Sequence, residues 1–206
     1  MKNFKNKITI SEKSALPIPA EKEILWAGQD GGCGHFPASK SNIIYRKYAP
    51  DPTPIYAFRD AVIKAQERIW MVDEYLLVSE KRKPNNRIET ISTWLQNDIN
   101  ANDIRLLTKH HDEIDIDALD KFKLRADAIN NSRPRNPVKC NIEIKTNLSN
   151  KIDYLHDRFA IIDDELWHFG ATVGGFHSSV NAVSRGWRAS EHGAIEFFEF
   201  LWKECE

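Results

Sequence analysis

The chain has 206 residues, and its 41% hydrophobic, 29% charged and 10% aromatic residues are typical of one well-buried globular domain rather than a disordered or fibrous chain. With a formal net charge of -1, no global field draws it to nucleic acid or to an anionic membrane, so a polyanionic ligand needs a local patch of cations. No apolar run approaches the roughly 20 residues of a membrane span, and the first residues lack the apolar centre of a signal peptide, so we expect a cytoplasmic protein with no transmembrane segment.

The first predicted elements are a strand and a helix. Residues 23–36 combine a short apolar run with a glycine cluster, which predicts a strand that leads into a loop. A helix is predicted to begin at Thr53, which can cap it, with Pro54 in its first turn. Apolar residues at helical spacing extend this helix to about Arg68, and these residues are Ile55, Phe58, Val62, Ala65 and Ile69.

The run "IWMVDEYLLV", residues 69–78, predicts a buried strand that contains two acids, Asp73 and Glu74. Charged side chains inside an apolar strand are costly unless they are paired. We therefore expect one of the two acids to line a site or to meet an arginine. An edge-strand position is the alternative explanation.

The remaining elements alternate until a late hairpin. They are a helical stripe over Ile88, Ile91, Leu95 and Ile99, a strand over 103–108, a helix over 112–130, a strand over 140–146, paired strands over 155–163 and 166–170, and a last helix with Ile195, Phe198, Leu201 and Trp202 on one face. Strands that alternate with helices and end in a hairpin predict an α/β sandwich with a mixed sheet.

Within the first strand of that hairpin, His156 and Arg158 stand two residues apart. Residues two apart on a strand point to the same face, so the two side chains are expected to project together while Asp157 and Phe159 point the other way. Arginine offers planar donors that match phosphate oxygens, and histidine can attack phosphorus or transfer a proton near neutral pH. Taken alone, the same pattern also fits a surface pair or a satisfied ion pair.

The wider pattern, His156-x-Arg158 followed by Asp163 and then Gly170, resembles the phospholipase D superfamily signature H-x-K-x-x-x-x-D with its following glycine. The order of the elements is also similar, over roughly residues 43–204. The resemblance implies a phospholipase D-like α/β/α sandwich with a mixed, mostly parallel sheet and a late β-hairpin. It places this domain at 43–206, with residues 1–42 as an N-terminal extension that packs on it.

The resemblance also implies a chemistry that needs neither metal nor cofactor. In that superfamily one histidine forms a phosphohistidine and a second protonates the leaving group, whereas this chain has one such motif. We therefore expect a homodimer in which two His156 side chains meet across a two-fold axis. One His156 would attack, the other would act as acid and then base, and both Arg158 side chains would hold the non-bridging oxygens.

Further residues complete the catalytic set that the resemblance implies. Glu191 is expected to orient the histidine ring. Asp163 is an odd number of residues from His156, so on a strand it would point to the opposite face, and we expect it to support the hairpin bend. Gly170 and Thr172 join Arg158 as phosphate-binding residues. Thr172 is a substitute hydroxyl, because Ala171 and the residue two positions later, Val173, replace the serine and asparagine of the signature, as Arg158 replaces its lysine.

We expect a nuclease-like phosphodiesterase that acts on nucleic acid. The alternative is a catalytically inactive module that binds phospholipid or nucleic acid, since the run "HDR" also resembles lipid-binding members of this fold. Such a module could be one subunit of a larger bacterial assembly, for example a defence system. A structural dimer that merely inherited the fold is a third possibility.

Two further patterns favour structural interpretations. Cys33, Cys140 and Cys205 lie far apart with no C-x-x-C spacing, which predicts reduced thiols and neither a disulfide framework nor a zinc site. His110 and His111, which two acids follow, could bind a divalent metal, but adjacent residues at a strand end point apart. A solvated helix start is favoured there, and we expect no bound metal.

Overall fold

A computed structural model describes residues 16–27, 34–48, 53–78, 87–112, 114, 116–174 and 179–206. These residues form a seven-stranded sheet with the strand order β1-β7-β6-β5-β2-β3-β4. The strands are β1 (Glu23–Trp26), β2 (Arg68–Val72), β3 (Asp103–Leu107), β4 (Asn141–Lys145), β5 (Phe159–Ile162), β6 (Glu165–Phe169) and β7 (Ala182–Arg188). The helices are α1 (Lys40–Tyr48), α2 (Thr53–Lys64), α3 (Arg87–Trp94), α4 (Ile116–Ser132), α5 (Leu148–Lys151) and α6 (Ala194–Glu204).

The sheet is mixed, which confirms the predicted α/β class. Parallel pairing is confined to β2 with β3 and β3 with β4, where helices α3 and α4 carry the chain back across the sheet. The pairs β1–β7, β2–β5, β5–β6 and β6–β7 are antiparallel. Parallel pairs are thus in the minority, contrary to the expected mostly parallel sheet. The late hairpin of β5 and β6 joins the sheet antiparallel to β2, and β7 and β1 continue the antiparallel part.

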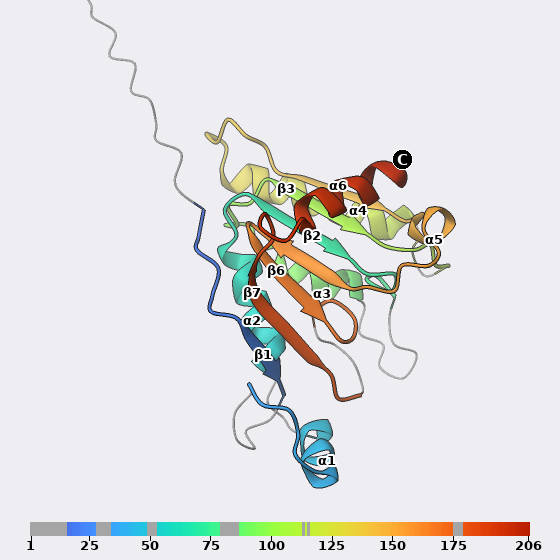
Figure 1. Ribbon diagram of the computed structural model, residues 1–206. Coiled ribbons are helices and arrows are strands. Elements are labelled where there is room, and N and C mark those ends of the chain that lie inside the picture. The colour runs from blue at the N-terminus through green and yellow to red at the C-terminus, as the bar shows by residue number, and fades with distance from the viewer. Residues whose placement is uncertain are drawn as a thin grey trace, which may run out of the picture.

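Helices cover both faces of the sheet, and each face has its own core. In Figure 1, α6 lies on the face toward the viewer, and α2, α3 and α4 lie behind the sheet. Alternation along β2 supplies both cores: Ile69 and Met71 pack with the helices behind, and Trp70 and Val72 pack with α6. The ring of Phe198 in α6 stacks on Trp70 with centroids 4.6 Å apart.

Two predicted elements end earlier in the structure than in the sequence analysis. Helix α2 begins at Thr53 as predicted, but it ends at Lys64, and Arg68 already opens β2. Strand β2 ends at Val72, so the two following acids lie just beyond the strand rather than inside it. There the backbone turns, with Leu76 N–H bonded to the Asp73 carbonyl at 3.1 Å.

Helix α3 also ends early, at Trp94, before Leu95 and Ile99 of the predicted stripe. The other predicted helices and strands are confirmed within a few residues, and three elements had not been predicted. These three are α1, α5 and β7. Strand β7 pairs with β1, so residues 23–26 form an edge strand of the sheet, while the division of the chain at residue 42 stays a prediction. Among the described residues, no helix is long and apolar enough to cross a membrane. Cys140 and Cys205 are free and buried, and Cys33 lies outside the described residues.

Candidate functional site

The candidate site lies where β2 and β3 end and β5 begins. Strands β2 and β3 run parallel, so their carboxyl ends meet at one edge of the sheet. Strand β5 runs antiparallel to β2 and places Phe159 opposite Val72. Residues that precede Phe159 therefore meet those that follow Val72 and Leu107. In open α/β sheets this edge is the usual place for a ligand.

His156 and Arg158 converge at this edge, although neither is on a strand. Strand β5 begins at Phe159, so the two residues lie in the loop that follows α5, which corrects the predicted strand position. Both still approach one carboxylate oxygen, Oε1 of Glu74. The Nδ1 atom of His156 is 3.3 Å from this oxygen, and a guanidinium nitrogen of Arg158 is 3.9 Å from it.

Glu74 is the centre of the cluster, and the end of β3 holds it in place. Lys109 donates to Oε2 of Glu74 at 2.9 Å, and the hydroxyl of Thr108 donates to the Glu74 backbone carbonyl at 3.1 Å. Burial alone raises the pKa of Glu74, but the hydrogen bonds from Lys109 and His156 outweigh it, so the pKa lies below its ordinary value. Glu74 is thus an anion that faces three cationic or ionisable groups.

The His156 side chain is positioned for chemistry at its outer nitrogen. Glu74 takes up Nδ1, and the side chain is 78% exposed. When Nδ1–H donates to the carboxylate, the lone pair of Nε2 is free. The imidazole can then attack an electrophile that approaches from solvent.

Arg158 lies deeper and has an unused donor. Its side chain is 23% exposed, and its Nε atom is buried without a hydrogen-bond partner within the described part of the chain. The nearest acid, Asp73, is 3.6 Å from Nε, which is too long for a hydrogen bond. The guanidinium also lies 5.6 Å from the ring centre of Tyr75. The guanidinium is therefore held by ion pairs with Asp73 and Glu74 rather than by a hydrogen bond at Nε.

Asp73 is fully buried beneath Arg158 and ties two loops together. Its carboxylate accepts the N–H of Tyr75 and the N–H of Val173, each at 2.8 Å. Burial raises the pKa of Asp73 above its ordinary value of 3.8, although these two N–H groups and Arg158 favour the anion. One of the two acids does therefore meet an arginine, as the sequence suggested.

The loop after β6 brings Gly170 and Thr172 to the same edge. Strand β6 runs antiparallel to β5 with His168 opposite Phe159, so its end lies beside the start of β5. Gly170 N–H bonds to the carbonyl of Ala182 at 3.0 Å, and Thr172 is half-buried. The phosphate-binding role of both residues stays a prediction.

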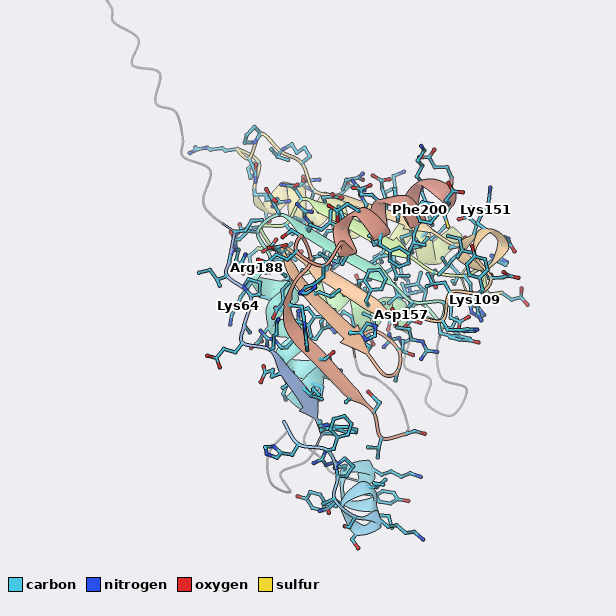
Figure 2. All side chains as sticks on the ribbon, viewed as in Figure 1. Lys64, Lys109, Lys151, Asp157, Arg188 and Phe200 are labelled. Carbon is cyan, nitrogen blue, oxygen red and sulfur yellow. The ribbon has the colours of Figure 1, made fainter. Side chains whose placement is uncertain are left out.

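Asp163 and Glu191 lie at the other ends of the strands, away from the candidate site, and do not contact His156. Asp163 is in the turn between β5 and β6, where its carboxylate accepts backbone N–H groups at the start of β2. Glu191 follows β7, and its carboxylate is 3.5 Å from Nε of Arg188. Figure 2 shows Arg188 and Asp157 well apart, toward opposite ends of the strands. The geometry gives Glu74 the contact with the histidine ring that was predicted for Glu191.

Asp157, between the two motif residues, pairs with a histidine on β6. Its Oδ1 is 2.6 Å from Nε2 of His168 on β6, and both side chains are about half exposed. The pair fixes the backbone between the two motif residues, because the same oxygen also accepts the N–H of Arg158 at 3.2 Å.

The sequence analysis missed Lys109, and although it expected one of Asp73 and Glu74 to line a site or to meet an arginine, it did not connect Glu74 with His156. The signal for Glu74 was a charge within an apolar run. Lys109 gave none, because a lysine after a strand is ordinary. Among the described residues, no group of three or more histidine, cysteine or acidic side chains is arranged to hold a metal ion.

We expect the raised pKa of Asp73 to appear in the pH dependence of stability. The folded protein keeps a proton on Asp73 at pH values where the unfolded chain has lost it, so its contribution to the free energy of unfolding falls as pH rises from about 3.8 through the folded pKa. Asp73→Asn lacks this contribution. Denaturant unfolding of both proteins should be measured between about pH 3.5 and 7, the range in which carboxyl groups titrate. Over this range, the free energy of unfolding of the parent should fall relative to that of the variant as pH rises. A constant difference would contradict the assignment.

No family model matches the chain, and no curated protein matches it. Among solved structures, it is similar to TrmBL2, described as an archaeal chromatin protein with a novel mode of DNA binding, at 14% identity and a TM-score of 0.41, over 75% of this chain and 50% of that one. It is also similar to NucT from Helicobacter pylori, at 11% identity and a TM-score of 0.45, over 74% of this chain and 89% of that one. The chain thus spans half the length of TrmBL2, and likenesses at these scores carry no argument about function.

Proposed function

We propose that the chain is a phospholipase D-like phosphodiesterase that works through His156, without metal, as a homodimer. One observation carries the proposal. Glu74 holds the His156 ring at Nδ1 and leaves Nε2 exposed, beside an Arg158 whose buried Nε has no hydrogen-bond partner among the described residues. A nucleophile next to a guanidinium suits an esterified phosphate.

The reaction has two steps. First, Nε2 of His156 attacks phosphorus, so an N–P bond forms and the P–O bond to the leaving alcohol breaks, while the imidazolium of His156 in a second copy gives its proton to the leaving oxygen. That imidazole then takes a proton from water, whose oxygen attacks phosphorus and breaks the N–P bond. A phosphomonoester is released and both histidines are regenerated. Arg158 from each copy balances the charge on the non-bridging oxygens.

Nucleic acid is the substrate class that we propose, because the single-motif proteins that the sequence resembles are nuclease-like. Lys109 adds a cation beside Arg158 at the same edge, and both lie close to the ring of Tyr75, at 3.7 and 5.6 Å. The remaining phosphates of a strand would meet this local positive charge.

The test incubates the full chain with single-stranded and double-stranded DNA and RNA in the presence of a chelator. Cleavage that persists in chelator, together with an acid-labile phosphate bound to the protein after rapid quenching, is the expected result. Cleavage that needs a divalent metal, or that leaves no covalent phosphoprotein, would contradict the mechanism.

The second candidate function is a binding module without turnover, for phospholipid or nucleic acid, that serves as a subunit of a larger assembly. The observation that favours it is the position of Arg158, 3.6 Å from Asp73 and 3.9 Å from Glu74. These carboxylates partly neutralise the cation that a phosphate must use. Sedimentation with neutral and anionic vesicles, and binding of labelled oligonucleotides without cleavage, would distinguish this module from the enzyme.

We expect Glu74→Gln to lower turnover about 10²-fold. An amide can no longer stabilise the charged ring of His156, and the loss is smaller than the ~10⁴-fold seen in buried catalytic triads because this contact is long and solvated. The rate constant on a chromogenic phosphodiester, with inhibition by inorganic phosphate as the binding control, measures it. Glu196→Gln, the same change on the exposed face of α6, should leave the rate unaltered.

A further inference from the structure

Strand β4 has no neighbouring strand on its outer side among the described residues. Strand β4 is the last strand in the sheet order, after β3. Asn141 N–H donates to the Asn102 carbonyl at 2.9 Å and the Lys145 carbonyl accepts from Thr108 at 2.9 Å, so odd-numbered residues of β4 bond toward β3. Because backbone groups alternate along a strand, Ile142 and Ile144 present their N–H and C=O groups outward. A row of such groups is a template for another strand.

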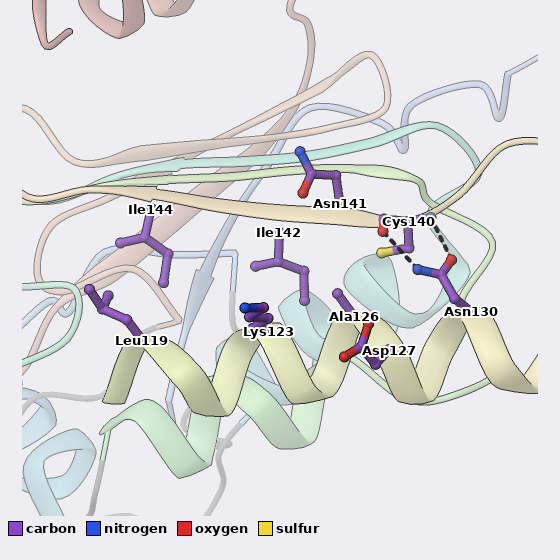
Figure 3. A pocket seen from close by; sticks show the side chains of 9 residues that line it. All are labelled: Leu119, Lys123, Ala126, Asp127, Asn130, Cys140, Asn141, Ile142 and Ile144. Carbon is purple, nitrogen blue, oxygen red and sulfur yellow. Dashed lines mark hydrogen bonds between the residues drawn. The ribbon is translucent and has the colours of Figure 1, made fainter. Parts of the chain in front are cut away.

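A groove runs along the same free edge, between β4 and α4. Figure 3 shows side chains from both elements converging on it, with Ile142 and Ile144 above the helix residues Leu119, Lys123 and Ala126. The groove has a volume of about 410 Å³, and Leu119 is 39% exposed at its mouth. The two isoleucines are only partly buried, so apolar surface remains for a partner.

We propose that a second copy of this chain occupies the edge, with the two β4 strands paired antiparallel about a two-fold axis through Ile144. The sequence "NIEIK" is self-complementary in this register. Ile144 lies opposite Ile144 of the second copy, where the outward N–H and C=O groups of each can bond to the other. Glu143 lies opposite Lys145 in both directions, and opposite charges directly across a strand pair stabilise it.

The side chains then meet suitable surroundings on both faces. Ile142 and Ile144 share the face of α4, so the isoleucines of the second copy extend the apolar strip beside the groove. Glu143 and Lys145 share the other face, where the ammonium of Lys145 donates to the Trp202 carbonyl at 2.7 Å and retains two further N–H donors for a cross-strand carboxylate. The neighbouring register, centred on residue 143, keeps the backbone bonds but sets Glu143 against Glu143. Charge therefore selects the register centred on Ile144.

This contact is distinct from the proposed meeting of the two His156 side chains. Strands β3 and β2 separate β4 from β5, and strands lie about 4.8 Å apart, so the two His156 side chains would be about 30 Å apart across the β4 edge. One two-fold axis cannot serve both contacts. If both form, they build a closed tetramer where the two axes intersect at right angles and an open chain otherwise, and loss of either contact leaves pairs.

Cysteine substitution in a background without the three native cysteines tests the register. Cα atoms of a directly opposed pair lie about 5.5 Å apart, within reach of a disulfide, so Ile144→Cys should give a covalent dimer on mild oxidation. Ile142→Cys is the matched control and should not, because its symmetry mate lies four residues along the strand. A covalent dimer from Glu143→Cys instead, or none from any of the three, would overturn the proposal.

Charge exchange tests the pairing without cysteines. Glu143→Lys should raise the dissociation constant of this contact at least about ten-fold, because two attractive cross-strand pairs become repulsive. The double variant Glu143→Lys with Lys145→Glu should recover association. Glu196→Lys makes the same charge change on α6 and should leave association unaltered. Equal masses for parent and Glu143→Lys in sedimentation equilibrium across the dissociation range would overturn the proposal.

Discussion

Replacing His156 by asparagine is expected to lower phosphodiester turnover by at least about 10⁴-fold, because one imidazole serves as nucleophile and its symmetry mate as proton donor. The side chain is 78% exposed, so the free energy of unfolding should stay within about 0.5 kcal/mol of the parent. The rate constant on a chromogenic phosphodiester and a denaturant unfolding curve measure the two quantities. His192→Asn, an exposed histidine before α6, is the matched control and should retain full activity.

Mixing the two proteins separates a dimeric from a monomeric mechanism. If each active centre needs two copies of His156, an excess of the His156→Asn variant should draw parent chains into inactive pairs and lower the activity per parent chain. Activity that stays proportional to the parent concentration would contradict the shared centre, even if the single substitution abolishes turnover. If the His156→Asn variant turns over substrate at the rate of the parent, the proposed role of this residue is wrong.

The core behind the sheet was predictable because its signals are local. Phe58 and Val62 recur at helical spacing and are fully buried in α2, and Ile88 and Ile91 recur in the same way and are buried in α3. Each residue could be placed from neighbours within one or two helical turns. Such periodicity survives whatever sheet order the chain adopts.

The end of α2 was not predictable, because a distant residue decides it. The apolar spacing continues through Ala65 to Ile69, but the backbone leaves the helix after Lys64. The carboxylate of Asp163 binds the N–H groups of residues 66, 67 and 68, nearly a hundred positions earlier in the chain. No pattern around residue 65 contains that contact.

The site was half predictable for the same reason. His156 and Arg158 could be recognised from their own spacing and chemistry. The carboxylate that holds the ring could not, because it depends on β5 lying next to β2, which the order of elements along the chain does not specify. The family resemblance implied Glu191, while the structure places Glu74 there.

Strand β7 was missed because its sequence "AVSRGWR" lacks the alternation of a half-buried strand. Gly186 interrupts it with a φ of +93°, a conformation that favours glycine. A β-carbon at this position would lie 2.5 Å from the carbonyl oxygen of Glu21. The strand is therefore shaped by close approach to the segment before β1, which only the folded chain reveals.

Replacing Asp163 is expected to have the largest effect on stability. Its carboxylate is buried and accepts three backbone N–H groups at the start of β2, those of Gln66 at 2.9 Å, Glu67 at 2.7 Å and Arg68 at 3.2 Å. An unsatisfied buried donor costs about 1–3 kcal/mol, so Asp163→Ala should lower the free energy of unfolding by about 4 kcal/mol. Denaturant unfolding measures this loss.

A second variant separates the carboxylate from the backbone, because Asp163 has a φ of 55° that alanine adopts poorly. Asp163→Gly removes the acceptor without this strain, so it should remain within about 1 kcal/mol of Asp163→Ala and well below the parent. Asp163→Asn keeps one acceptor oxygen and should fall between glycine and the parent. If Asp163 only supports the start of β2, the fraction of each variant that is folded should turn over substrate at the parent rate. A glycine variant as stable as the parent would contradict the acceptor role, and a folded variant without activity would assign Asp163 to the chemistry.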